Sequence, residues 1–212
     1  MTRRAPLVAA GVLWAVAAAW YLVAEAVAAR ALSGYGYAAD YISDLGIPGS
    51  SPAAAVMNLG FAGQGLLFAL AGALVFVAAP AWRGRGVFLA LAVAHGVGNV
   101  LVGLVHSGSR EPGVDWHVVG AAMAIVGGNA AVIAGGLVLR PSARPRAFRG
   151  ASVVLGAAGL VSLLVLTAGS VAGVTLPFGA GAWERGSVYP IIAWELLAAL
   201  AVLRRQGTEG VR

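Results

Sequence analysis

Six apolar runs dominate this chain, and each is long enough to cross a lipid bilayer as a helix. A transmembrane helix needs about 20 mainly apolar residues, because the hydrocarbon core is about 30 Å thick. The sequence therefore predicts an all-α, polytopic membrane protein, a bundle of six transmembrane helices in which residues 1–212 form a single transmembrane domain. The predicted spans are residues 7–28, 53–79, 86–105, 118–139, 151–171 and 187–203.

Charged residues are too scarce for a soluble protein of this size. They make up 10% of the chain, against about 25% in soluble domains. The net charge is +6, but most of the 14 basic residues, all arginine, lie just beyond the apolar runs. We therefore expect the lipid bilayer as a partner and no nucleic acid. The lack of cysteine excludes disulfides, thiolate metal sites and cysteine nucleophiles.

The arginines also predict the orientation of the chain. Short cytoplasmic segments carry an excess of Lys and Arg. With the N-terminus inside, 11 of the 14 arginines fall in cytoplasmic segments, and three fall outside: Arg30, Arg110 and Arg185. The sequence thus predicts a multi-pass protein of the cell membrane with both termini in the cytoplasm.

The first outer loop, residues 29–52, is the longest predicted connection and is rich in aromatic and acidic residues. Loops longer than about 12–15 residues are usually functional or disordered, and this composition is not that of a disordered segment. We expect the loop to pack on the bundle as a cap. Its candidate site residues are Asp40, Tyr41, Ser43 and Asp44.

Polar residues inside the spans mark a second candidate region. His95 and Asn99 share one helical face, and Glu195 is expected at about the same depth as His95, which suggests a contact between the two ionisable groups. Asn58, Gln64 and Asn129 could complete a polar interior. Two interpretations remain open: hydrogen bonds that hold helices together, or a pathway for a substrate or proton.

A third group lies at the predicted outer ends of the spans. Imidazole and carboxylate side chains suit a divalent metal such as zinc, which could activate water for hydrolysis. The candidate ligands are His106, His117 and Asp115. Glu184 and Arg185 are expected in the outer segment before the last span, and Glu25 is expected to pair locally with Arg30.

The stretch from Asp40 to Gly46, followed by Asn58 to Phe61, resembles the domain-of-unknown-function family 998, a group of bacterial and archaeal membrane proteins. Two further positions fit the same resemblance: His117 lies at the start of the fourth span, and Glu184 precedes Tyr189. It implies six spans over nearly the whole chain. It implies no activity, because none is established for that family.

Three classes of function remain open. The leading one is an integral membrane protein that binds, or also transports, a lipid or small hydrophobic molecule taken from the outer face. The second is a membrane-embedded, metal-assisted hydrolase or transferase with its site at the outer face. The third is an accessory subunit with a protein partner. Neither a phosphate-binding Gly-x-x-x-x-Gly-Lys loop nor a Gly-x-Ser-x-Gly elbow is present, so the sequence leaves enzymatic activity undecided.

Overall fold

The computed structural model describes residues 4–79, 83–108, 113–139 and 145–209. Within these ranges the chain is all-helical, without a strand, and six helices are long and apolar enough to cross a membrane. The protein is therefore a multi-pass membrane protein, as predicted. The elements are α1 (Arg4–Ala31), the 3-10 helix η1 (Ser43–Gly46), α2 (Ala54–Ala78), α3 (Arg85–Leu104), α4 (Trp116–Val138), α5 (Pro145–Ala172) and α6 (Ala180–Glu209).

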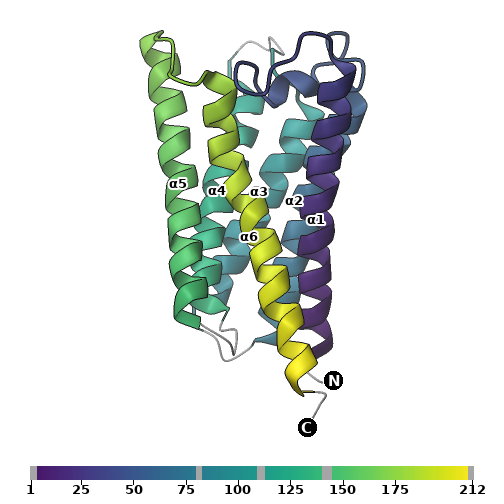
Figure 1. The fold of residues 1–212 in the computed structure, drawn as a ribbon, viewed down its shortest axis with the longest axis vertical. Coiled ribbons are helices and arrows are strands. Elements are labelled where there is room, and N and C mark those ends of the chain that lie inside the picture. Colours follow the sequence, from purple (N-terminus) through teal and green to yellow (C-terminus); the bar gives the residue numbers. More distant parts are fainter. Residues whose placement is uncertain (1–3, 80–82, 109–112, 140–144, 210–212) are drawn as a thin grey trace.

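Helices α1 to α4 pack successively as antiparallel neighbours, and α6 closes the bundle by returning to α1 (Figure 1). Helix α5 lies at the edge, against α4 and α6. Both chain ends lie at one end of the bundle, which we call the terminal end. The opposite end carries residues 32–53, which we call the cap, and is here named the capped end.

Glycines allow the central helices to approach closely. A Cβ atom added to Gly60 would lie 2.6 Å from Cβ of Ala24, and one added to Gly65 would lie 3.0 Å from the carbonyl oxygen of Gly96. Small residues at such contacts are typical of membrane helix packing. The cluster of glycines between residues 60 and 65 therefore brings α2 against α1 and α3, which fixes the walls of the interior.

The last helix begins earlier than the sequence predicted. Helix α6 starts at Ala180 rather than at residue 187, so Pro190 lies inside the helix instead of near its start. Glu184 and Arg185 made this region look like a loop, because two charged residues lower its hydropathy. The structure places both side chains within the helix, where partners from other elements satisfy them.

Four aromatic residues form a layer across the bundle, which we call the aromatic floor: Trp14, Phe68, Phe88 and Trp194. All four side chains are completely buried, and the rings of Trp14 and Trp194 meet edge to face with centroids 5.2 Å apart. Trp14 and Trp194 therefore pack between helices. On α3, Phe88 lies seven residues, or about 10 Å, farther from the capped end than His95.

Candidate functional site

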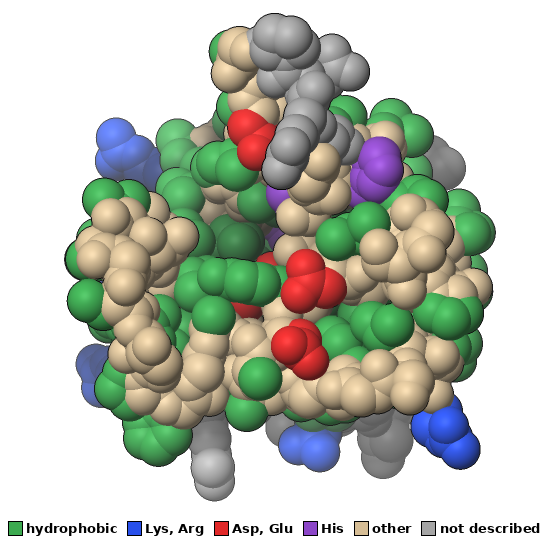
Figure 2. Space-filling model, turned by 90° about the horizontal axis from the view of Figure 1, so that it is seen from above, with side chains coloured by type: hydrophobic (Ala, Val, Ile, Leu, Met, Phe, Trp, Pro, Cys, Tyr) green, Lys and Arg blue, Asp and Glu red, His purple; other side chains and the backbone are tan. Residues whose placement is uncertain are grey.

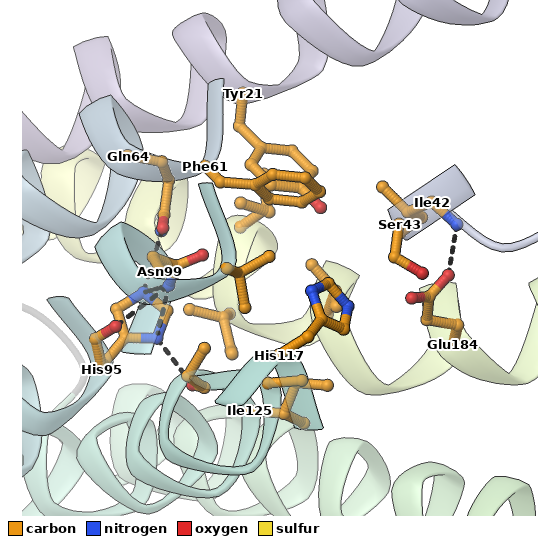
Figure 3. Close-up of a pocket in the computed structure, with 16 residues that line it drawn as sticks. Tyr21, Ile42, Ser43, Phe61, Gln64, His95, Asn99, His117, Ile125 and Glu184 are labelled. Atoms are coloured by element: carbon orange, nitrogen blue, oxygen red, sulfur yellow. Dashed lines mark hydrogen bonds between the residues drawn. The ribbon is translucent and has the colours of Figure 1, made fainter. Parts of the chain in front are cut away.

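A cavity of about 50 Å³ lies between the cap and the aromatic floor. Its walls come from the cap and from α1, α2, α3, α4 and α6 (Figure 3). Apolar side chains make up the middle of the wall, and polar side chains stand at its two ends. The lining residues are Tyr21, Ile42, Ser43, Phe61, Gln64, His95, Asn99, Val102, His117, Ala121, Ala124, Ile125, Glu184, Val188, Ile191 and Ile192.

A hydrogen-bonded chain of three polar side chains lies at the inner end of the cavity. His95 Nδ1 is 2.7 Å from the carbonyl oxygen of Ala124, and Nε2 is 3.0 Å from Gln64 Oε1. Gln64 Nε2 in turn donates to Glu195 Oε1 at 3.1 Å. The amide of Asn99 lies over the His95 ring, 3.3 Å from each ring nitrogen. All four side chains are buried, so this is a fully enclosed polar group.

The outer end of the cavity is polar as well, because Glu184, Ser43 and His117 converge there (Figure 3). The Glu184 carboxylate accepts a hydrogen bond from the backbone N–H of Ile42, which ties α6 to the start of η1. His117 Nδ1 donates to the carbonyl oxygen of Val105 at 2.7 Å, which fixes the ring at the start of α4. Together these groups give the cavity two hydrogen-bonding ends separated by an apolar wall.

Arg185 fastens the cap to the bundle. Its guanidinium donates to the carbonyl oxygens of Tyr37 and Asp40 and to the hydroxyl of Tyr35, all in the cap. The same group pairs with Glu25 of α1 at 2.9 Å, and its carbon atom lies 4.5 Å from the centre of the Tyr37 ring. A guanidinium has five donors in a planar fork, so one side chain can hold all these partners at once.

Tyr residues complete this network. Burial raises the pKa of the Tyr35 phenol to about 12, so the hydroxyl stays protonated and donates to the carbonyl oxygen of Tyr41 at 3.0 Å. On α6, the hydroxyl of Tyr189 donates to the Glu25 carboxylate at 3.0 Å. The buried carboxylate of Glu25 is therefore neutralised by one arginine and hydrogen-bonded by one tyrosine, both from the same face of α6.

The cap holds its own shape through short-range contacts. The Asp40 carboxylate accepts from the N–H of Gly36 at 2.8 Å, and that of Asp44 accepts from the N–H of Tyr41 at 3.1 Å. Burial raises the pKa of the Asp44 carboxyl. Asn58 of α2 donates to the carbonyl oxygen of Gly46 at 3.0 Å. The prediction that this loop packs on the bundle is confirmed, with η1 as its helical part.

The surface of the capped end carries mainly negative charge. Figure 2 shows acidic side chains near the middle of this face, beside a hollow, and the arginine side chains that are coloured in this view lie at its margin. Asp40 and Asp44 belong to the cap, and Asp115 and Glu184 lie at the capped ends of α4 and α6, whereas Glu25 is buried and paired with Arg185. A cationic or neutral molecule would therefore meet a more favourable field here than an anion would.

The sequence of this chain matches, over residues 15–201, the family described as protein of unknown function DUF998. The chain belongs to this family. The matched segment contains every residue of the cavity wall, together with Glu195 and Arg185. No curated protein and no solved structure matches the chain.

Two predicted contacts of this DUF998 protein are wrong in detail. Glu25 pairs with Arg185 rather than with Arg30, because Glu25 faces the bundle whereas Arg30 is exposed at the end of α1. His95 and Glu195 do not pair directly, because the side chain of Gln64 lies between them and bonds to both. Of the residues predicted to complete the polar interior, Gln64 bonds to both His95 and Glu195. Asn58 donates to Gly46 of the cap and Asn129 donates to the carbonyl oxygen of Ser187, so neither joins this group.

The three predicted metal ligands do not gather. Among the described residues, no three His, Asp or Glu side chains stand close enough to hold a metal ion. Asp115 caps α4 by accepting from the N–H of Val118 at 3.1 Å, and His117 points into the cavity with one ring nitrogen bound to Val105. His106 forms no such group with them.

Sequence reasoning did not propose Tyr21, Tyr35 or Tyr189 as site residues, and it gave Gln64 only a secondary place. Tyr189 lies four residues after Arg185, so the two share a face of α6, and this spacing was a usable signal. Tyr21 of α1 lines the cavity, but nothing in its local sequence distinguishes it from an interfacial tyrosine. Gln64 was visible as a polar residue inside a span, whereas its position between two ionisable groups depends on how three helices pack.

Proposed function

We propose that this DUF998 protein binds a small, mainly apolar molecule with a hydrogen-bonding group in the cavity beneath the cap. One observation carries the proposal: an apolar wall between two polar ends, enclosed by a cap that several buried contacts hold in place. Ligand sites are typically concave and mostly apolar, with a few polar groups that fix the ligand's orientation. His95 and Gln64 at one end and Glu184 and Ser43 at the other are the groups placed to do this.

The size of the cavity limits the ligand. A volume of about 50 Å³ holds about three to five water molecules, at 10–15 Å³ each. The ligand is therefore either a very small molecule or one end of a longer lipid whose remainder extends out of the cavity. The acidic face around the capped end favours a neutral or cationic polar group over an anionic one.

The cap controls entry in this proposal. Ile42 and Ser43 belong to the cap and line the cavity, so a ligand that enters from the capped end must displace them. Release of the cap requires loss of the contacts with Arg185 and Glu184. Movement of the same ligand across the membrane would need a further opening through the aromatic floor. The hydrolase and accessory-subunit alternatives have no comparable geometric support among the described residues.

We further propose that the capped end faces the outside of the cell membrane and that both termini lie in the cytoplasm. The excess of arginine near the terminal end supports this orientation. Several of these arginines lie outside the described residues: Arg3, Arg140, Arg144 and Arg212.

Cysteine labelling tests the orientation, because the natural chain has no cysteine. We expect a Ser33→Cys variant, in the cap near the end of α1, to react with a membrane-impermeant maleimide in intact cells. A Thr2→Cys variant should react only after lysis. The reverse pattern would show that the capped end faces the cytoplasm.

Filling the cavity should abolish ligand binding. Ala121 lines the cavity, and the next residue, Ala122, is exposed on the outside of the same helix. In native mass spectrometry of gently solubilised protein, we expect the wild type and Ala122→Phe to retain a bound small molecule. Ala121→Phe should lose it while remaining folded. Equal retention by both variants, or no bound molecule in the wild type, would refute the proposed binding site.

A further inference from the structure

The hydrogen bonds of His95, Gln64 and Glu195 at the inner end of the cavity restrict where their protons can be. A backbone carbonyl only accepts, so His95 Nδ1, which faces the carbonyl oxygen of Ala124, must carry a proton. A carboxamide offers an accepting oxygen at one side and a donating nitrogen at the other. Gln64 stands between His95 Nε2 and Glu195 Oε1, so it must present its oxygen to one and its nitrogen to the other.

Only two arrangements of this chain satisfy every contact with no net charge. In the first, as the structure places the amide, Glu195 is ionised, Gln64 donates to it, and a doubly protonated His95 donates to Gln64. In the second, the amide is turned by 180°, a protonated Glu195 donates to Gln64, and Gln64 donates to His95 Nε2. The change from second to first moves one proton from the Glu195 carboxyl to His95 Nε2, and the amide turn restores both hydrogen bonds. Release of this proton from His95 Nε2 to water in the cavity then leaves an ionised Glu195 and a His95 that keeps only its Nδ1 proton.

We propose that His95, Gln64 and Glu195 form a proton-binding site inside the membrane, which exchanges its proton with one side only, through the cavity at the capped end. This inference goes beyond ligand binding and holds whichever molecule occupies the cavity. Ionisable groups at such depth are costly in a membrane and commonly belong to proton relays. A purely structural role would be served as well by three neutral amides or hydroxyls.

The cavity supplies the route on the capped side. His95 and Gln64 line it directly, and its volume of about 50 Å³ admits about three to five water molecules. Glu195 stands behind Gln64 and does not line the cavity, so its proton must pass by way of the other two side chains. The second carboxylate oxygen of Glu195 is buried and has no hydrogen-bond partner among the described residues.

The aromatic floor blocks the other side. Phe68 lies one helical turn below Gln64, and its ring stands 4.7 Å from that of His95, centre to centre. The ring of Trp194 packs against Phe68, with centroids 6.0 Å apart, and against Phe88 at 6.2 Å. Phe88 lies seven residues nearer the terminal end of α3 than His95. All three side chains are completely buried. None of these rings carries a titratable group, so in this proposal the layer is the barrier to exchange with the terminal end.

Among the described residues, no arginine and no second carboxylate lies at the inner end of the cavity. The remaining titratable groups that face the cavity are Tyr21 of α1, His117 of α4 and Glu184 of α6, all nearer the capped end. Helix α2 contributes only Gln64 and α3 only His95 and Asn99 as polar groups to the wall. Arg185 is engaged with Glu25 and the cap, and none of the described arginines lines the cavity.

The test uses infrared difference spectroscopy on proteoliposomes whose capped end faces outward. We expect an external pH step to change the carboxylic-acid band of Glu195 at once, in the same step as the His95 ring signal. An internal step should have no prompt effect. Glu195→Gln removes the band and assigns it; if that variant fails to fold, Glu195→Asp shifts the band instead. His95→Asn assigns the ring signal.

Two further variants separate a proton relay from a structural contact. Gln64→Leu is expected to uncouple the two groups, so that they titrate with midpoints at least about one pH unit apart. Trp194→Ala is expected to let an internal pH step reach Glu195. The proposal is overturned if the Glu195 band of the wild type does not change after a pH step on either side of the membrane, or changes equally after a step on each side. It is also overturned if the Glu195 band changes while the His95 ring signal does not. These measurements on the wild type do not depend on whether it retains a bound molecule in native mass spectrometry, so the two proposals can fail separately.

Discussion

Replacing Arg185 with alanine is expected to lower the free energy of unfolding by about 3–5 kcal/mol, the usual cost of removing one partner of a buried ion pair. Glu25 is 2% exposed and would keep a buried carboxylate without its cation. The same substitution removes every bond between the Arg185 guanidinium and the cap. Thermal unfolding in detergent, followed by the fluorescence of the tryptophans, measures the effect.

Arg30→Ala is the matched control, because it removes an arginine near Glu25 in sequence but exposed on the surface. We expect it to change the unfolding free energy by less than about 0.5 kcal/mol, as surface substitutions usually do. Equal destabilisation by Arg30→Ala and Arg185→Ala would contradict this account. It would indicate that Glu25 depends on Arg30 as much as on Arg185, and that the contacts of Arg185 with the cap add no stability of their own.

Replacing Trp194 with alanine is expected to destabilise the protein by an amount on the order of 3 kcal/mol, as for other large buried aromatic side chains. Trp194 is completely buried against Trp14 and Phe68, and its indole N–H donates to Ser152 Oγ at 2.9 Å. In a membrane the lost stabilisation comes mainly from van der Waals packing, because lipid is as apolar as the helix interface. The substitution would also open the floor beneath the cavity.

Trp116→Ala serves as the control for Trp194, since Trp116 is 53% exposed at the start of α4. We expect little change in its unfolding temperature. A Trp194→Ala protein as stable as Trp116→Ala would show that the aromatic floor contributes nothing to the fold, and its role as a barrier would then be untenable.

The sequence predicted the spans well because hydropathy is a local property that needs no knowledge of neighbours. The six predicted runs all became helices, and the composition of the first loop correctly predicted a packed cap. The start of α6 was missed because Glu184 and Arg185 look like loop residues until their partners are known. Those partners, in the cap and in Glu25 of α1, lie more than 140 residues away in the chain.

Contacts between distant parts of the chain were also missed in the interior of the bundle. The sequence placed His95 and Glu195 near one depth, which the structure supports through their common partner, Gln64. It could not place α2 between them, because helix neighbours follow from packing at glycines such as Gly65 rather than from polarity. The metal prediction grouped residues by the side of the membrane alone, whereas Asp115 is used as a helix cap.

The most direct test of the account asks whether Arg185 controls access to the cavity. Ala121→Cys places a single thiol in the cavity wall, and Ala122→Cys places one on the lipid side. Arg185→Lys keeps a cation beside Glu25, but an ammonium lacks the planar fork that holds the cap. The measurement is the rate of labelling by a small, water-soluble thiosulfonate, with and without Arg185→Lys. The account predicts slow labelling of Ala121→Cys that Arg185→Lys accelerates, with no such change for Ala122→Cys; an unchanged rate at Ala121→Cys would contradict it.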